Sequence, residues 1–179
     1  MQTHVLHILL DAARMEEKIE DAKSLNDECL CLYSGKSEIS LASIAPYLFT
    51  FNKDNEFEHW FFDKGWGDSW GVLVYSRENM KTLHKHFRKF LMVKTETGES
   101  LFFRFYDPRV LRLFLPTCDH QQLKEFFGPV DYFICEDEDP ANALIFSFRE
   151  EQLVTSKLTK EQVMIFEPVV KIKPGFSFF

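Results

Sequence analysis

The stretch FFRFYDPRVLRLF (Phe102–Phe114) joins two apolar runs through a short polar segment and decides how the chain passes between them. Asp107 followed by Pro108 is typical of a helix start, because the Asp side chain accepts hydrogen bonds from the first turn and Pro lacks only an N–H that has no helical partner there. Arg104 and Arg109 can pair with Asp107 or with other carboxylates, and so fix the angle between strand and helix. We therefore predict that these residues form a structural joint between a strand and a helix.

A second interpretation of the same stretch is a catalytic or ligand-binding cluster, since Arg, Tyr and Asp lie close together in it. An anion site at a helix start favours Gly and free backbone N–H groups, whereas Asp107 and Pro108 occupy this start. On a strand that reaches Tyr106, the side chains of Arg104 and Tyr106 would face one side and the flanking Phe rings the other. The joint accounts for each of these residues, so we prefer it.

The composition of the 179-residue chain is that of a globular protein, with 45% hydrophobic and 27% charged residues. The length fits one domain, or one domain with a small appendage. Phe is unusually frequent, at 20 residues, and its large apolar area can supply a core of this size. An excess of Phe can also line a surface groove for an apolar partner. We expect most of the Phe side chains in the core.

Charge is distributed unevenly along the chain. The net charge is −7, which disfavours nucleic acid as a partner because phosphate neutralisation needs a basic surface. Residues 77–112 nevertheless hold nine Lys or Arg against four Asp or Glu, and an acidic run occupies Glu136–Asp139. Such a bipolar surface suits docking to another protein, although a solvated helix face and an acidic loop would give the same pattern.

The four cysteines are Cys29, Cys31, Cys118 and Cys135, and no pair has CxxC spacing. The N-terminal run has no basic leader, so we expect reduced thiols and a cytoplasmic location. No window reaches the roughly 18 apolar residues that a membrane span needs. We therefore expect no membrane partner.

Strand-like and helix-like segments alternate along the chain. Apolar runs predict strands, and amphipathic segments with a period of 3.6 residues predict helices. The expected strands include residues 4–10, 29–33, 70–76, 130–135 and 143–148, and the expected helices include residues 12–24, 79–91 and 119–127. This order predicts an α/β fold, with a mixed β-sheet flanked by helices and a small C-terminal extension.

Residue types that could carry catalysis are present without a working arrangement. Cys118, Asp119 and His120 are adjacent in sequence, whereas catalytic Cys–His pairs converge from distant segments. Asp119 with Gln122 instead matches a capping box. No histidine pair has the spacing of a zinc site with a carboxylate, and no phosphate-binding glycine pattern occurs. We therefore expect no enzyme activity, no metal and no cofactor.

Three features are candidates for partner binding. Trp66 lies in the Gly-rich turn GWGDSWG, where an exposed Trp would serve as an anchor. A basic helix face and an apolar tail are the others, and the tail could add as a strand to a partner sheet. Their residues are Lys81, Lys85, Arg88 and Lys89 for the helix face, and Phe176, Phe178 and Phe179 for the tail.

Seven short segments follow one another in a characteristic order along the chain. They are LLDAA (Leu9–Ala13), LYSG (Leu32–Gly35), APYLF (Ala45–Phe49), WGDSWGVLVYS (Trp66–Ser76), LHKHFRKFLMV (Leu83–Val93), FRFYDPRVL (Phe103–Leu111) and FGPV (Phe127–Val130). In these segments the chain resembles the adaptor chaperones of the bacterial type VI secretion system, a family formerly classed as a domain of unknown function. The stretch FRFYDPRVL is the most telling of the seven.

The resemblance implies a non-enzymatic adaptor that binds a secreted effector and promotes its loading onto the valine-glycine-repeat spike protein. It also implies a scaffold lobe, here residues 1–135, followed by a variable C-terminal region, here residues 136–179, which is short in this chain. Two alternatives remain open. An immunity-type protein that binds and neutralises a toxin would also be small and acidic, and a hydrolase could be built around Asp107 or Cys118.

Overall fold

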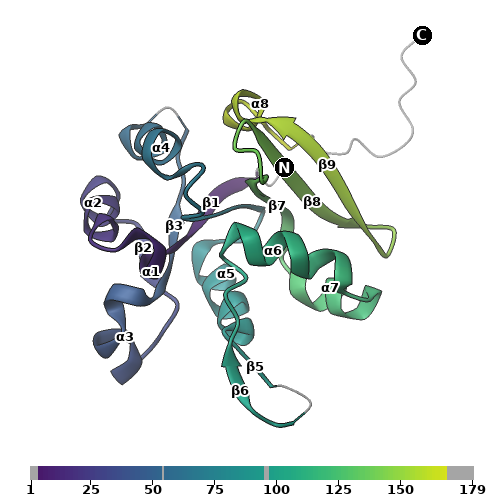
Figure 1. Ribbon diagram of the computed structural model, residues 1–179, viewed down its shortest axis with the longest axis horizontal. Helices are drawn as coiled ribbons and strands as arrows, with labels where there is room; N and C mark the ends of the chain where they lie inside the picture. The colour runs from purple at the N-terminus through teal and green to yellow at the C-terminus, as the bar shows by residue number, and fades with distance from the viewer. Residues whose placement is uncertain (1–3, 54, 95–96, 169–179) are drawn as a thin grey trace.

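A seven-stranded β-sheet runs through the computed structural model, which describes residues 4–53, 55–94 and 97–168 (Figure 1). The strand order is β2-β3-β1-β4-β7-β8-β9. The strands are β1 Val5–Asp11, β2 Cys29–Cys31, β3 Pro46–Thr50, β4 Gly71–Ser76, β7 Val130–Glu136, β8 Asn142–Arg149 and β9 Gln152–Thr159. A separate hairpin pairs β5 (Met92–Lys94) with β6 (Ser100–Phe102). A sheet flanked by helices confirms the predicted α/β class.

Every pairing among the described strands of the large sheet is antiparallel. The predicted mixture of parallel and antiparallel pairs is therefore not found among them. The reason lies at one end of the sheet, where β1 and β2 run in the same direction but do not touch. β3 lies between them and pairs antiparallel with both, which splits what would otherwise be a parallel βαβ unit.

Helices and short helical turns connect the strands. The α-helices are α1 Ala12–Met15, α2 Lys18–Leu25, α3 Lys36–Ser40, α4 Glu56–Trp60, α5 Met80–Phe87, α6 Pro108–Phe114, α7 His120–Phe127 and α8 Lys160–Met164. The shorter turns are η1 Ala42–Ile44, η2 Phe61–Gly65, η3 Arg88–Phe90 and η4 Leu115–Thr117. The single helix expected over residues 12–24 is two helices, because the backbone of Glu16 takes a positive φ of 55° between them.

Two apolar cores cover the two faces of the sheet, because side chains alternate along each strand. On β1, Ile8 and Leu10 pack into one core and Leu9 into the other. The first core contains side chains of α1, α2, α4 and α8, and the second those of α5, α6 and α7, which lie together beside the sheet in Figure 1. Most of the described Phe side chains are buried in these two cores, as predicted.

Local capping positions several helices. Asp119 accepts from the backbone N–H of Gln122 and the Gln122 side chain accepts from Asp119, so α7 has the predicted capping box. The helix ends at Gly128, whose φ of 45° lies in the left-handed region. A Cβ at this position would collide with the ring of His86, so Gly128 also allows α5 and α7 to approach closely.

The sheet continues past the boundary expected near residue 135, because β8 pairs with β7 and β9 pairs with β8. The division into a scaffold lobe and a C-terminal region stays a prediction. The tail candidates Phe176, Phe178 and Phe179 lie outside the described residues. Across the described part of the chain, no helix has the length and apolar character needed to cross a membrane.

Candidate functional site

The strand–helix joint is built around Asp107, the N-cap of α6. Its carboxylate accepts from the Arg109 backbone N–H at 3.0 Å and from Arg109 Nε and Nη2 at 3.0 and 2.6 Å, while Pro108 begins the helix. The strand was expected to reach Tyr106, but β6 ends at Phe102. The chain then turns, with the Asp107 N–H donating to the Arg104 carbonyl at 3.0 Å, so the joint is a turn and a helix cap.

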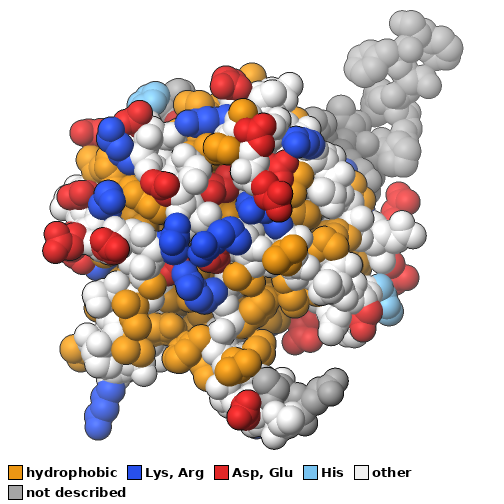
Figure 2. All heavy atoms as spheres, in the orientation of Figure 1, with side chains coloured by type: hydrophobic (Ala, Val, Ile, Leu, Met, Phe, Trp, Pro, Cys, Tyr) orange, Lys and Arg blue, Asp and Glu red, His pale blue; other side chains and the backbone are white. Residues whose placement is uncertain are grey.

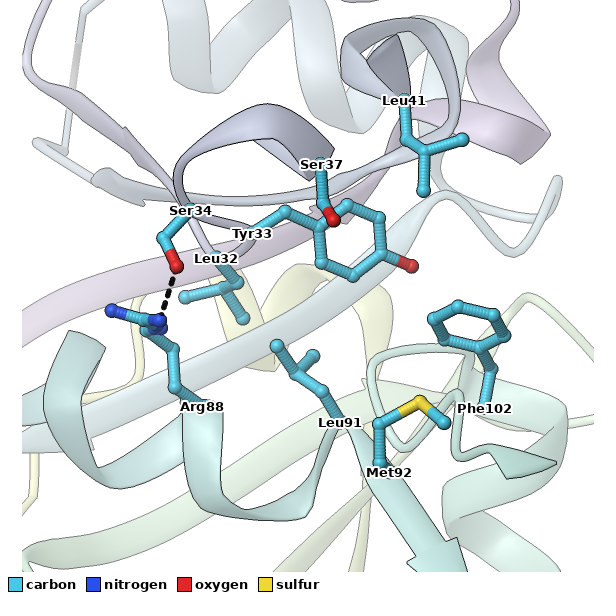
Figure 3. A pocket seen from close by; sticks show the side chains of 9 residues that line it. All are labelled: Leu32, Tyr33, Ser34, Ser37, Leu41, Arg88, Leu91, Met92 and Phe102. Atoms are coloured by element: carbon cyan, nitrogen blue, oxygen red, sulfur yellow. Dashed lines mark hydrogen bonds between the residues drawn. The ribbon is translucent and has the colours of Figure 1, made fainter. Parts of the chain in front are cut away.

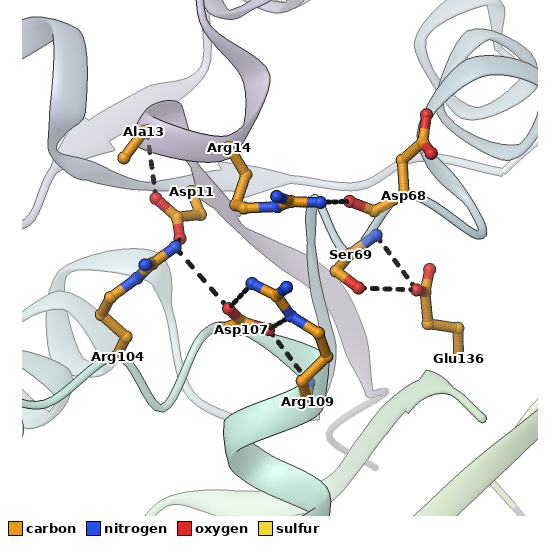
Figure 4. Close-up of polar contacts among 9 residues, drawn as sticks. All are labelled: Asp11, Ala13, Arg14, Asp68, Ser69, Arg104, Asp107, Arg109 and Glu136. Atoms are coloured by element: carbon orange, nitrogen blue, oxygen red, sulfur yellow. Dashed lines mark hydrogen bonds and ion pairs between the residues drawn. The ribbon is translucent and has the colours of Figure 1, made fainter. Parts of the chain in front are cut away.

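Arg104 connects this joint to a second helix start far away in the sequence (Figure 4). Its Nε donates to Asp11 Oδ2 at 3.1 Å, its Nη2 makes a closer contact with the same oxygen, and Asp107 Oδ2 lies 3.6 Å away. Asp11 ends β1 and caps α1 by accepting from the Ala13 N–H at 3.1 Å. One guanidinium thus ties the first turns of α1 and α6 together. Asp11 was not predicted as a member of this cluster, although an Asp between an apolar strand and a helix is an N-cap signal.

The pKa values of the two carboxyl groups in this cluster are shifted in opposite directions. Burial raises the pKa of Asp11, and the Arg104 guanidinium only partly offsets that effect. Burial also acts on Asp107, but the side chain and backbone N–H of Arg109 hold its pKa below the ordinary value. Because each carboxylate is held by an Arg and by a backbone N–H, the cluster is arranged as a structural tie between helices.

Hydrogen bonds to the buried side chain of Glu136 fix the Gly-rich turn around Trp66. Glu136 accepts from the backbone N–H groups of Gly67 and Ser69 at 2.6 and 3.0 Å, and from the Ser69 hydroxyl at 3.0 Å. The Trp66 ring is buried, and its indole N–H donates to the Pro140 carbonyl at 2.7 Å. Little of the ring is therefore available for an external partner, and its anchoring role stays a prediction.

The basic helix face is exposed. Lys81 and Lys85 project from α5, and Arg88 and Lys89 follow on η3. Arg88 differs from the others because its Nη2 donates to the Ser34 hydroxyl at 2.5 Å. This contact brings its guanidinium to the end of an apolar groove.

The groove lies between α3 and the β5–β6 hairpin, and its volume is about 300 Å³ (Figure 3). Leu32 and Leu91 are buried at its base, and the rings of Tyr33 and Phe102 stand 6.0 Å apart, centroid to centroid. Its lining residues are Leu32, Tyr33, Ser34, Ser37, Leu41, Arg88, Leu91, Met92 and Phe102. The groove was not predicted from the sequence, because its residues come from two segments more than forty positions apart.

The groove belongs to a larger apolar surface. Figure 2 shows hydrophobic side chains gathered over α3 and the β5–β6 hairpin, with basic side chains directly above them beside α1 and α6. Phe102 is 60% exposed, although nearly all other described Phe side chains are at least half-buried. The large apolar side chains exposed on these elements and on the neighbouring turn η1 are Ile39, Ile44, Met92, Val93, Leu101, Phe102 and Leu113. An exposed apolar surface of this kind is typical of a protein-binding site.

Cys118, the candidate thiol nucleophile, lies in the connection between η4 and α7. Cys118 Sγ donates to the Phe114 carbonyl at 3.5 Å, and burial raises the thiol pKa, which disfavours the nucleophilic thiolate. Asp119 caps α7, and His120 is exposed at the first position of that helix. Within the described ranges, no group of three or more His, Cys, Asp or Glu side chains is placed to hold a metal ion.

Fold and surface together define an α/β protein that presents an apolar, basic-rimmed face. The chain belongs to the family described as Domain of unknown function (DUF4123), whose model matches residues 6–125. This range runs from β1 into α7 and includes the Asp11–Arg104–Asp107 tie and the groove. No curated protein and no solved structure matches the chain.

Proposed function

We propose that this protein is a cytoplasmic adaptor chaperone that binds a type VI secretion effector and promotes its loading onto the valine-glycine-repeat spike protein. It acts by binding alone, without a catalytic step, a cofactor, nucleic acid or a membrane. The observation that carries the proposal is the apolar groove and its surroundings, a surface suited to protein binding in a member of this family. The ordered sequence segments, from LLDAA to FGPV, favour the secretion adaptors as the family's functional class.

The surface offers apolar area for affinity and basic side chains for partner choice, and an adaptor needs both. Fully burying an exposed Phe, Leu or Met contributes about 1.5–3 kcal/mol. Because Met92, Leu101 and Phe102 are about half exposed, each can contribute part of that free energy when a partner covers it. The basic residues beside the groove favour partners of the opposite charge and increase the association rate. An effector segment that is apolar and aggregation-prone on its own is thereby covered until it is transferred.

The test is a deletion of this gene in its native host, followed by measurement of effector level, effector secretion and co-purification with the spike. The proposal expects loss of secretion of one effector, while the secretion of other effectors continues. Unchanged secretion of every effector contradicts it. Neutralisation of a toxin's activity, with secretion intact, would instead identify the immunity-type alternative.

A further inference from the structure

We propose that the groove between α3 and the β5–β6 hairpin binds an acidic amphipathic segment of the partner protein. Apolar side chains of that segment enter the groove, and one of its carboxylates pairs with Arg88. This inference deepens the proposed function and rests on it, because it names the surface and the chemistry of the segment that the adaptor recognises.

The shape of the groove sets the apolar half of the recognition. Leu32 and Leu91 form a closed base, while Met92 and Phe102 stand exposed at the rim. The rings of Tyr33 and Phe102 contact each other, with centroids 6.0 Å apart, so together they form one aromatic wall against which a partner side chain would pack. An apolar side chain packed against this wall and the buried base is the kind of anchor found at the centre of a protein-binding hot spot.

The positive charge of Arg88, which has no carboxylate partner among the described residues, accounts for the preference for an acidic segment. Arg88 is the one charged residue among the nine described residues that line the groove, and its guanidinium donates a hydrogen bond to the neutral hydroxyl of Ser34. Among the described residues, no carboxylate lies within ion-pair distance of its guanidinium. An arginine already oriented by one hydrogen bond loses little freedom when it binds a carboxylate in two-point fashion.

Three further arginines near the groove also favour a negatively charged partner segment. Arg104 and Arg109 are partly exposed beside a second open hollow next to Leu113. Their charges are shared with the two buried aspartates, and Arg14, which belongs to α1, donates to the Asp68 carbonyl and not to a carboxylate. On α3 and the hairpin, the described residues Lys36 and Lys94 balance Glu38 and Glu99. The excess positive charge among the described residues therefore comes from Arg14 and Arg88, so the segment that fits is acidic although the whole chain has a net charge of −7.

The test replaces Phe102 with the photo-crosslinking residue p-benzoylphenylalanine in the native host, and mass spectrometry identifies the cross-linked peptide. The matched control places the same residue at Val154, which is 42% exposed on the edge strand β9. We expect cross-links from position 102 to a segment that contains large apolar residues and at least one Asp or Glu. Cross-links from position 154 to the same partner with none from 102, a segment without carboxylates, or a second copy of this chain would each overturn the proposal, as would no cross-link at all.

Charge reversal completes the test with purified proteins. Arg88→Glu is expected to weaken binding of the cross-linked partner about tenfold, as for loss of one close charge pair. The control Lys85→Glu, on the same basic face but outside the groove, should change it less than about twofold. Equal effects of the two substitutions would refute a specific pair at Arg88, and unchanged melting midpoints confirm that both variants are folded.

The two proposals fail separately. If position 102 cross-links an acidic amphipathic segment of a protein unrelated to secretion, the docking surface stands and the secretion role fails. If deletion abolishes secretion of an effector whose cross-links avoid position 102, the secretion role stands and the docking surface fails.

Discussion

Replacing Arg104 with Ala tests whether the tie between α1 and α6 stabilises the fold. The substitution removes both donors to Asp11, whose side chain is fully buried, and leaves that carboxylate with the Ala13 N–H. Breaking a fully buried ion pair costs about 3–5 kcal/mol. Because the Arg104 side chain is 40% exposed, solvent screening reduces that cost, and we expect a loss of about 2 kcal/mol.

The loss should depend on pH with a definite sign. Burial already raises the pKa of Asp11, and removal of Arg104 raises it further. An acid whose pKa is higher in the folded state than in the unfolded state takes up a proton on folding, so its ionisation destabilises the fold as pH rises through that interval. The effect of Arg104→Ala should therefore be larger at neutral pH than near pH 4, the ordinary pKa of Asp being about 3.9.

Urea unfolding followed by Trp fluorescence measures both quantities, since Trp66 and Trp70 are buried. The matched control is Arg77→Ala, which breaks the surface pair with Asp131, 2.7 Å long and with the Arg77 side chain 55% exposed. It should cost less than about 1 kcal/mol. If Arg104→Ala costs no more than this control, or if its cost is the same at both pH values, the tie is not a stabilising element.

Three further perturbations have defined outcomes in the same urea assay. Glu136→Gln removes the charged acceptor of the Gly-rich turn and should lower the free energy of unfolding by about 1.5–3 kcal/mol. Ser69→Ala should lower it less. A larger loss for Ser69→Ala would contradict the role of Glu136 as the main acceptor of the turn. Gly128→Ala should cost at least about 1–2 kcal/mol from the left-handed backbone alone, and an unchanged unfolding midpoint would exclude that strain. His7 is buried, makes no well-formed side-chain hydrogen bond within the described residues, and has its pKa lowered by burial to about 4. Because the pKa of His7 is lower in the folded state than in the unfolded state, the free energy of unfolding should fall by about 3 kcal/mol between pH 6.5 and 4. The stability of His7→Leu should depend less on pH over that range. If both proteins lose the same stability, His7 is not the group responsible.

Short-range features of the fold could be predicted from the sequence. The Asp107–Pro108 helix start, the capping box of Asp119 and Gln122, and the helix end at Gly128 all follow from residues within four positions of one another. Their hydrogen bonds form between neighbours in the chain, so residue type and spacing are sufficient. The alternation of apolar segments also predicted the α/β class correctly.

Long-range features depended on the tertiary structure. The partner of Arg104 is Asp11, 93 positions away, and β3 inserts between β1 and β2, so strand direction could not be inferred from the order of elements. The groove is likewise assembled from two distant segments, one around Tyr33 and one around Phe102. Sequence alone determined where α6 and α7 begin and where α7 ends, because those capping contacts are local. Sheet order and packing decided which side chains are buried together and which apolar residues remain exposed for a partner, because those contacts form only when distant segments meet.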